Sequence, residues 1–357
     1  MNKALFVLPL ILLSLLTAIW TGWLRIGWVL PLSQSAAQHG ALMVGSFLST
    51  LIFLERAVTF RQKWVLLLPF VNGLSVLFFA LGHSSASLLC LIAGSAGFWV
   101  MCGYFIYKYK ELYYYVFFAG AFCLLAGNVI LYKTNFYPNA VKWWITFLLM
   151  TIVAERLELS RFLPLSKGQR VALMVSLAAC LATLFVPFHL YGNFLFAGAL
   201  VAVAVWLLRN DMAWRSLKVA GQHRYSASLL ITGYVWLLVT AGWLVLGNRF
   251  AFSYDAALHS FFIGFVFSMI FSHAPIILPA VLKLPIKLYR PSLYGWFYLL
   301  QASLVIRIAG DVLTNVDVRR VGGLLNGVAM LLFFINVGVI VRQELGKRAK
   351  RAVLKPH

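Results

Sequence analysis

Acidic residues are scarce in this chain. Asp and Glu account for 9 of its 357 residues, and charged residues of both signs make up only 11% of the sequence. Soluble domains carry about 25% charged residues, whereas this chain is 62% hydrophobic. The composition therefore excludes a separate soluble domain. It predicts an all-α integral membrane protein with a single polytopic transmembrane domain over residues 1–357.

Cysteine is also rare, and its spacing excludes two kinds of site. The four cysteines lie in apolar segments, and none belongs to a CxxC or CxxCH motif. Thiolate-bound zinc and covalently attached haem are therefore both disfavoured. The N-terminal apolar run lacks a convincing signal-peptide cleavage site and continues beyond Ala18, so we interpret it as the first membrane span.

Hydropathy divides the chain into about twelve apolar segments joined by short connections, which predicts about twelve transmembrane helices. Short connections indicate that consecutive helices are antiparallel neighbours. The predicted spans are centred near Leu13, Leu48, Asn72, Ser95, Cys123, Leu149, Ala179, Leu200, Leu237, Val266, Leu300 and Leu332.

Basic residues orient these spans. The net charge is +21, and 23 of the 30 Lys and Arg residues fall in the connections on one side, with seven on the other. Because basic connections stay on the cytoplasmic side, this bias predicts cytoplasmic N and C termini. The charge is thus a topology signal rather than a nucleic-acid footprint. We expect a multi-pass protein of the bacterial inner membrane, with the lipid bilayer as partner and no nucleic acid.

The tenth span contains two histidines. The segment from Ala256 to Leu282 is apolar for about 27 residues, yet it carries His259 and His273, fourteen residues apart. On a helix this spacing is close to four turns, so both rings share one face about 21 Å apart. A titratable ring in a membrane span either satisfies a buried hydrogen bond or binds a metal, a haem or a proton.

The predicted topology places His39 and His259 at similar depth, each at the outer start of a span. Two neutral imidazoles at matched depth in an apolar bundle suit the axial positions of a b-type haem. Arg307, near the outer end of the eleventh span, is placed to meet the haem propionates. Arg307 and Asp311 are also spaced i,i+4, so they could instead neutralise each other on one helix face.

A copper site is the weaker metal hypothesis. Copper needs two or three imidazoles within a few ångströms. His189 and His83 are the additional outer candidates, and His83 also suits a solvated turn.

A faint internal repeat links the second and sixth spans. The second ends in FLERAV, with Glu55 and Arg56, and the sixth in VAERLELSRF, with Glu155 and Arg156 at an offset of 100 residues. These pairs are either interfacial anchors or marks of equivalent helices. The sixth span has Asn139 where the offset places the counterpart of His39.

Two segments carry a family resemblance. QHGALMVGSFLSTL and ALHSFFIGFVFSMIFSHAP resemble the histidine motifs of the NnrS family, which are twelve-span haem- and copper-containing membrane proteins of the nitric oxide response. That family in turn resembles subunit I of haem-copper oxidases. The resemblance implies that His39 and His259 are haem ligands and that His273 is a second metal or haem candidate. The sixth span has no histidine and the seventh only His189, so an oxidase-type copper centre is incomplete.

The leading functional hypothesis is a haem-binding protein that handles nitric oxide, a related diatomic gas or electrons in the membrane. The sequence leaves open a haem-dependent oxidoreductase, a sensor or a protective sink, and also the electron donor. The alternative is a proton-coupled secondary transporter in which His273, Glu55 and Glu155 relay protons. Pro275 and Pro279 lack a symmetric partner span, which disfavours that alternative. A third hypothesis is an assembly subunit with inert buried histidines.

Overall fold

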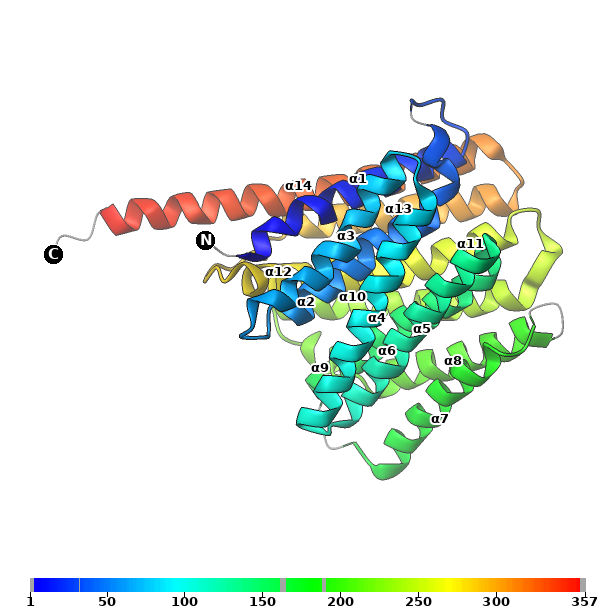
Figure 1. Ribbon diagram of the computed structural model, residues 1–357, viewed down its shortest axis with the longest axis horizontal. Coiled ribbons are helices and arrows are strands. Elements are labelled where there is room, and N and C mark those ends of the chain that lie inside the picture. The colour runs from blue at the N-terminus through cyan, green and yellow to red at the C-terminus, as the bar shows by residue number, and fades with distance from the viewer. Residues whose placement is uncertain (1–2, 32, 161–164, 188–190, 354–357) are drawn as a thin grey trace. The chain divides into compact units, whose positions relative to one another are not determined.

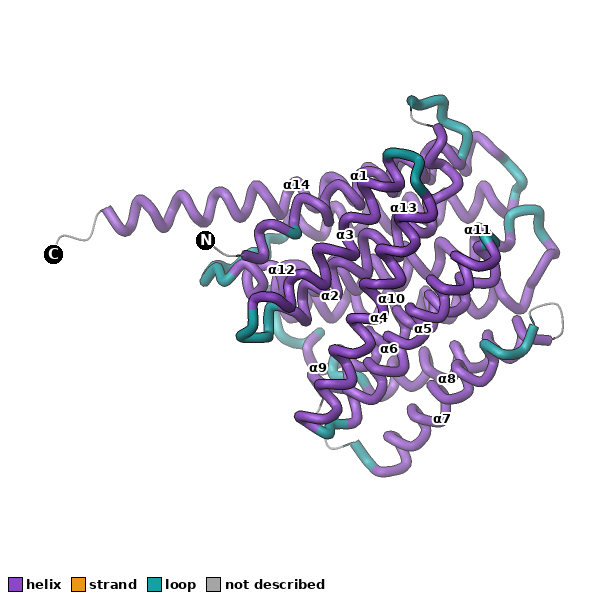
Figure 2. Tube along the Cα trace, in the orientation of Figure 1, coloured by secondary structure: helices purple, strands orange, loops and turns teal. Residues whose placement is uncertain are grey.

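The computed structural model describes residues 3–31, 33–160, 165–187 and 191–353, and within these ranges the chain is helical without any strand (Figure 2). The all-helical prediction is therefore confirmed for the described residues. The connections are short, and several helices end at a residue with positive φ, including Lys110 and Asn135. Each of the twelve predicted span centres lies inside a helix.

The helices are α1 (Leu8–Arg25), η3 (Ala41–Ser49) continued by α2 (Thr50–Ala57), η4 (Lys63–Leu66) continued by α3 (Leu67–Ala80), α4 (Ser84–Tyr109), α5 (Leu112–Thr134), α6 (Tyr137–Leu159), α7 (Lys167–Thr183), α8 (Asn193–Asn210), α9 (Ala213–Ser216), α10 (Gln222–Leu246), α11 (Ser253–His259) continued by η8 (Ser260–Phe267) and α12 (Ser268–Leu282), α13 (Ser292–Val312) and α14 (Val316–Val353). Short 3-10 turns, η1 (Lys3–Phe6), η2 (Ser33–Gln38) and η7 (Gly247–Arg249), complete the order.

Among the described residues, nine helical stretches are long and apolar enough to cross a membrane. They include α4, α5 and the continuous stretch from α11 to α12, which runs from Ser253 to Leu282. Length and composition therefore support a membrane protein built of helices, as hydropathy predicts.

The chain forms two compact units, Met1–Trp206 and Leu207–His357. In the first unit, α3 to α6 pack as consecutive neighbours, and α1 packs against η3 and α3 (Figure 1). Its interior is aromatic, with Trp144 fully buried and the rings of Phe53 and Phe98 stacked 4.3 Å apart.

In the second unit, α10 packs against α11, η8 and α12, and α13 packs along α14. The rings of Phe271 and Phe333 stack with centroids 3.6 Å apart and join α12 to α14. Close packing through small residues is the usual means of helix association in lipid. Here Gly233 and Gly264 lie directly against Met269 and Trp236.

Candidate functional site

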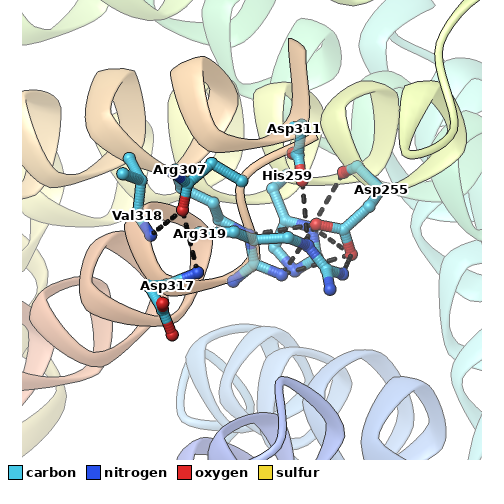
Figure 3. Close-up of polar contacts among 8 residues, drawn as sticks. Asp255, His259, Arg307, Asp311, Asp317, Val318 and Arg319 are labelled. Atoms are coloured by element: carbon cyan, nitrogen blue, oxygen red, sulfur yellow. Dashed lines mark hydrogen bonds and ion pairs between the residues drawn. The ribbon is translucent and has the colours of Figure 1, made fainter. Parts of the chain in front are cut away.

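A cluster of buried and half-buried charges, here called the Asp255 cluster, lies within the second unit. It comprises Asp255 and His259 of α11, Arg307 and Asp311 of α13, and Arg319 of α14 (Figure 3). Asp255 and His259 are one helical turn apart, as are Arg307 and Asp311, so each pair projects from one helix face. Trp243, Ala256 and Ala257 form an apolar core beside the cluster.

Two glycines bring α13 and α14 together at this point. A Cβ atom at Gly310 would lie 2.4 Å from the backbone nitrogen of Arg319, and one at Gly322 would lie 2.4 Å from that of Arg307. Both distances are too short for any larger residue. The turn between the helices is fixed by Asn315, whose side-chain oxygen accepts hydrogen bonds from the first amides of α14. This close approach puts Arg307 and Arg319 beside each other.

Asp255 binds both arginines. Arg307 Nε donates to Asp255 Oδ2 at 3.1 Å, and its Nη2 donates to Oδ2 at 2.9 Å and to Oδ1 at 3.2 Å. Arg319 Nη2 lies 3.2 Å from Asp255 Oδ1, and its guanidinium stacks 4.4 Å above the ring of Phe252. The Arg307 side chain is 8% exposed. Removing one partner of such a buried pair leaves an uncompensated charge, which is strongly destabilising.

Asp311 is the least satisfied member of the cluster. Its residue is 1% exposed, and Oδ1 lies 2.9 Å from Arg319 Nε. That contact lacks hydrogen-bond geometry, so within the described part of the chain neither carboxylate oxygen has a hydrogen-bond partner. Arg307 pairs with Asp255 rather than with Asp311, which differs from the i,i+4 pairing that the sequence made plausible. The reason is that α11 supplies a closer carboxylate.

His259 is held by Asp255 twice. Its Nδ1 lies 2.8 Å from the Asp255 backbone oxygen and 3.4 Å from Oδ1 of the same residue. A carbonyl oxygen can only accept, so Nδ1 carries the proton and the lone pair of the neutral ring lies on Nε2. This is the tautomer in which a histidine binds a metal through Nε2, with its other nitrogen oriented by a carbonyl or carboxylate.

His39 shows the same arrangement in the first unit. Its Nδ1 lies 2.8 Å from the backbone oxygen of Ala18 and 3.4 Å from Thr21 Oγ1, both on α1. The ring packs on Gly22, where a Cβ atom would lie 3.0 Å from Cε1. The proton is again on Nδ1 and the lone pair on Nε2.

Both histidines stand at the start of a π-helix. His39 is two residues before η3, and His259 is the residue before η8. π-helical turns are rare and are frequently found at functional sites. Periodicity in the sequence gives no signal for them.

His273 lies on α12 and is half-buried. Its Nδ1 is 2.8 Å from the Met269 backbone oxygen, one turn earlier in the same helix. Pro275 leaves the carbonyl of Phe271 without its helical amide, and that oxygen accepts the Tyr225 hydroxyl instead, at 3.1 Å. The Nδ1–H of His273 therefore donates to Met269 and not to the Phe271 carbonyl.

The remaining predicted ligand, His189, lies outside the described residues. Within the described ranges, no three or more His, Cys, Asp or Glu side chains are grouped to hold a metal ion.

Asp255 and Arg319 are the site residues that sequence reasoning missed. Asp255 did carry a signal, because an acid four residues before a histidine is notable in a chain with nine acids. Arg319 had no local signal, since its role depends on the packing of α14 against α13.

Comparison with known proteins identifies a family but no activity. No curated protein and no solved structure matches the chain. A family model described as Domain of unknown function (DUF8744) matches residues 4–342, and the chain belongs to that family.

Proposed function

We propose that this protein is a haem-binding membrane protein of the bacterial inner membrane, with about twelve transmembrane helices and both termini in the cytoplasm. Its proposed role is the response to nitric oxide or another diatomic gas, or electron transfer in the membrane, as in the NnrS family that it resembles. His39 and His259 each serve as an axial ligand of b-type haem. Among the described residues, His273 is the histidine that we propose for a second metal. The resemblance implies that this metal is copper.

The observation that carries this proposal is the tautomer shared by His39 and His259. Each donates Nδ1–H to a backbone oxygen at 2.8 Å, which leaves Nε2 as the nitrogen donor of a neutral imidazole. This donor set fits an axial haem ligand. Bound haem would supply the iron that takes a diatomic ligand or an electron.

Around His259 the chain supplies orientation. The backbone and side-chain oxygens of Asp255 both face Nδ1, so they fix the ring and raise its basicity as a ligand. Arg307 and Arg319 hold the Asp255 carboxylate. Arg307 thus acts on His259 through Asp255. Two aspartates balance two arginines in the cluster. Arg307 would therefore assist a haem propionate by hydrogen bonding rather than by surplus positive charge.

The test is an absorption spectrum of the purified chain supplied with haem, oxidised and then reduced. We expect a Soret band that shifts on reduction, and that is lost or displaced in His39→Ala and in His259→Ala. His223→Ala is the matched control, because His223 is an exposed histidine at the start of α10. An unchanged spectrum in both ligand variants, or no haem in the wild type, would overturn the proposal and favour the transporter.

A further inference from the structure

A second charge cluster, made of half-buried side chains, lies in the first unit, where α2 and α6 end. Arg56 Nη2 contacts Glu155 Oε1 at 3.0 Å, and Nη1 contacts Glu158 Oε2 at 3.2 Å. Glu55 Oε1 is 3.7 Å from Nη2. The Arg56 guanidinium also lies 4.3 Å from the ring centre of Phe117 on α5. We call Glu55, Arg56, Glu155 and Glu158 the Arg56 cluster.

Carboxylates are in excess here. Three of them contact the one guanidinium of Arg56, and they still outnumber guanidinium groups by one if the buried neighbour Arg156 is counted. Among the described residues, the other titratable side chains facing the cluster are a thiol and a phenol, whose ordinary pKa values lie above about 7, so neither adds negative charge there. These are Cys102 of α4, close to Arg56, and Tyr114 of α5, close to Glu158. Carboxylates that share a low-dielectric site cannot all stay ionised without further positive charge.

A proton suits this excess better than a metal ion. The guanidinium lies among the three carboxylates, and the described residues hold no group of such ligands that could bind a metal. Glu55 is the natural acceptor, since it is the farthest of the three from Arg56 and shares no hydrogen bond with it.

A buried hydroxyl without a hydrogen-bond partner among the described residues lies one helical turn from the cluster. Thr151 lies one turn before Glu155 on the same face of α6, is 2% exposed, and has no hydrogen-bond partner for Oγ1 in the described part of the chain. Its Oγ1 faces Gly120 of α5. Gly120 is three residues from Phe117, whose ring contacts the Arg56 guanidinium. A buried hydroxyl that bonds to neither its own helix nor a neighbour is a group ready to donate to or accept from the cluster.

A separate hydrogen-bonded polar chain joins the helix of η3 and α2 to α3. Thr50, five residues before Glu55, accepts from Asn72 Nδ2 at 2.8 Å, and Ser75 Oγ donates to the Asn72 carbonyl at 2.6 Å. Ser75 and Ser46 share a hydrogen bond of 2.7 Å. All four residues are fully buried. Buried hydrogen bonds therefore join Ser46 and Thr50, on the helix that leads to Glu55, to α3.

We propose that the Arg56 cluster is a proton-binding site, in which Glu55 takes one proton from water at that end of the unit. The proton adds to a carboxylate oxygen, the carboxylate becomes a carboxylic acid, and the charge of the cluster rises by one. No other bond changes. The site is independent of haem binding at the histidines.

Infrared difference spectroscopy of the full chain in lipid tests this directly, because a buried protonated carboxyl has its own C=O stretching band. We expect that band in the wild type near pH 7, and its loss in Glu55→Gln. Glu111→Gln, at an exposed glutamate before α5, should retain it. Asp311→Asn separates any contribution from the other buried, unsatisfied carboxyl.

Stability gives a second readout. If the folded chain holds a proton that the unfolded chain releases, thermal stability falls as the pH rises from about 5 to about 8. Glu55→Gln, which mimics the protonated acid, should reduce that slope, whereas Glu111→Gln should leave it unchanged. A wild type without a protonated carboxyl across this range, or a band and a slope unchanged in Glu55→Gln, would show that the cluster is a structural ion pair network only.

Discussion

Asp255 and Arg307, 52 residues apart in the chain, form a buried two-pronged ion pair that joins the first turns of α11 to the end of α13. The pair holds together the helix that carries His259 and the helix pair α13–α14. Its geometry matches carboxylate and guanidinium edge to edge, which is the strongest form of such a contact. The orientation of His259 therefore depends on a residue that lies on a different helix.

Asp255→Asn should destabilise the protein strongly. Arg307 and Arg319 would then face a neutral amide, and breaking a buried pair costs about 3–5 kcal/mol. Asp317→Asn is the matched control, because Asp317 is an acid on α14 whose side chain is 91% exposed. Its loss should cost less than about 1 kcal/mol. Thermal unfolding in detergent measures both. Equal melting temperatures would show that the Asp255 cluster contributes no stability.

Gly322→Ala should force α13 and α14 apart. The added methyl would lie 2.4 Å from the backbone of Arg307, so the helices must shift, at a cost of about 1–3 kcal/mol. Gly338→Ala, on the same helix but with nothing within 4 Å, should be neutral or stabilising by up to about 1 kcal/mol. Unfolding curves of the two variants check this contrast. If both behave alike, the close approach at Gly322 is not required.

His273→Ala should leave haem bound and remove any second metal. The residue is fourteen positions from His259, and its Nδ1 is committed to the Met269 carbonyl, so only Nε2 could serve a ligand. Metal analysis of the purified chain, beside its haem spectrum, gives the answer. Unchanged metal and haem content would make His273 a structural residue.

Reporter fusions test the proposed topology. The 23-to-7 partition of basic residues predicts an external location after Gly82 and after Asn193, and a cytoplasmic one at Arg215 and at both termini. A reporter that is active only outside the cytoplasm should therefore work at the first two positions alone. Cytoplasmic signals after Gly82 would contradict the predicted placement of His39 at the outer start of its span.

The amino-acid sequence by itself determined where the helices lie. Hydropathy and helix length are local properties, so each predicted span centre falls inside a helix. The scarce acids also marked much of both charge clusters, since five of the nine acidic residues belong to them.

Only the tertiary structure decided which charges meet. The sequence offered Asp311 as the partner of Arg307 and Glu55 as the partner of Arg56, because both are near in the chain. Instead Arg307 binds Asp255, and Arg56 makes its short contacts with Glu155 and Glu158. Which charges meet depends on how the helices pack, and that packing is set by residues such as Gly310 and Gly322, whose contacts no local pattern encodes.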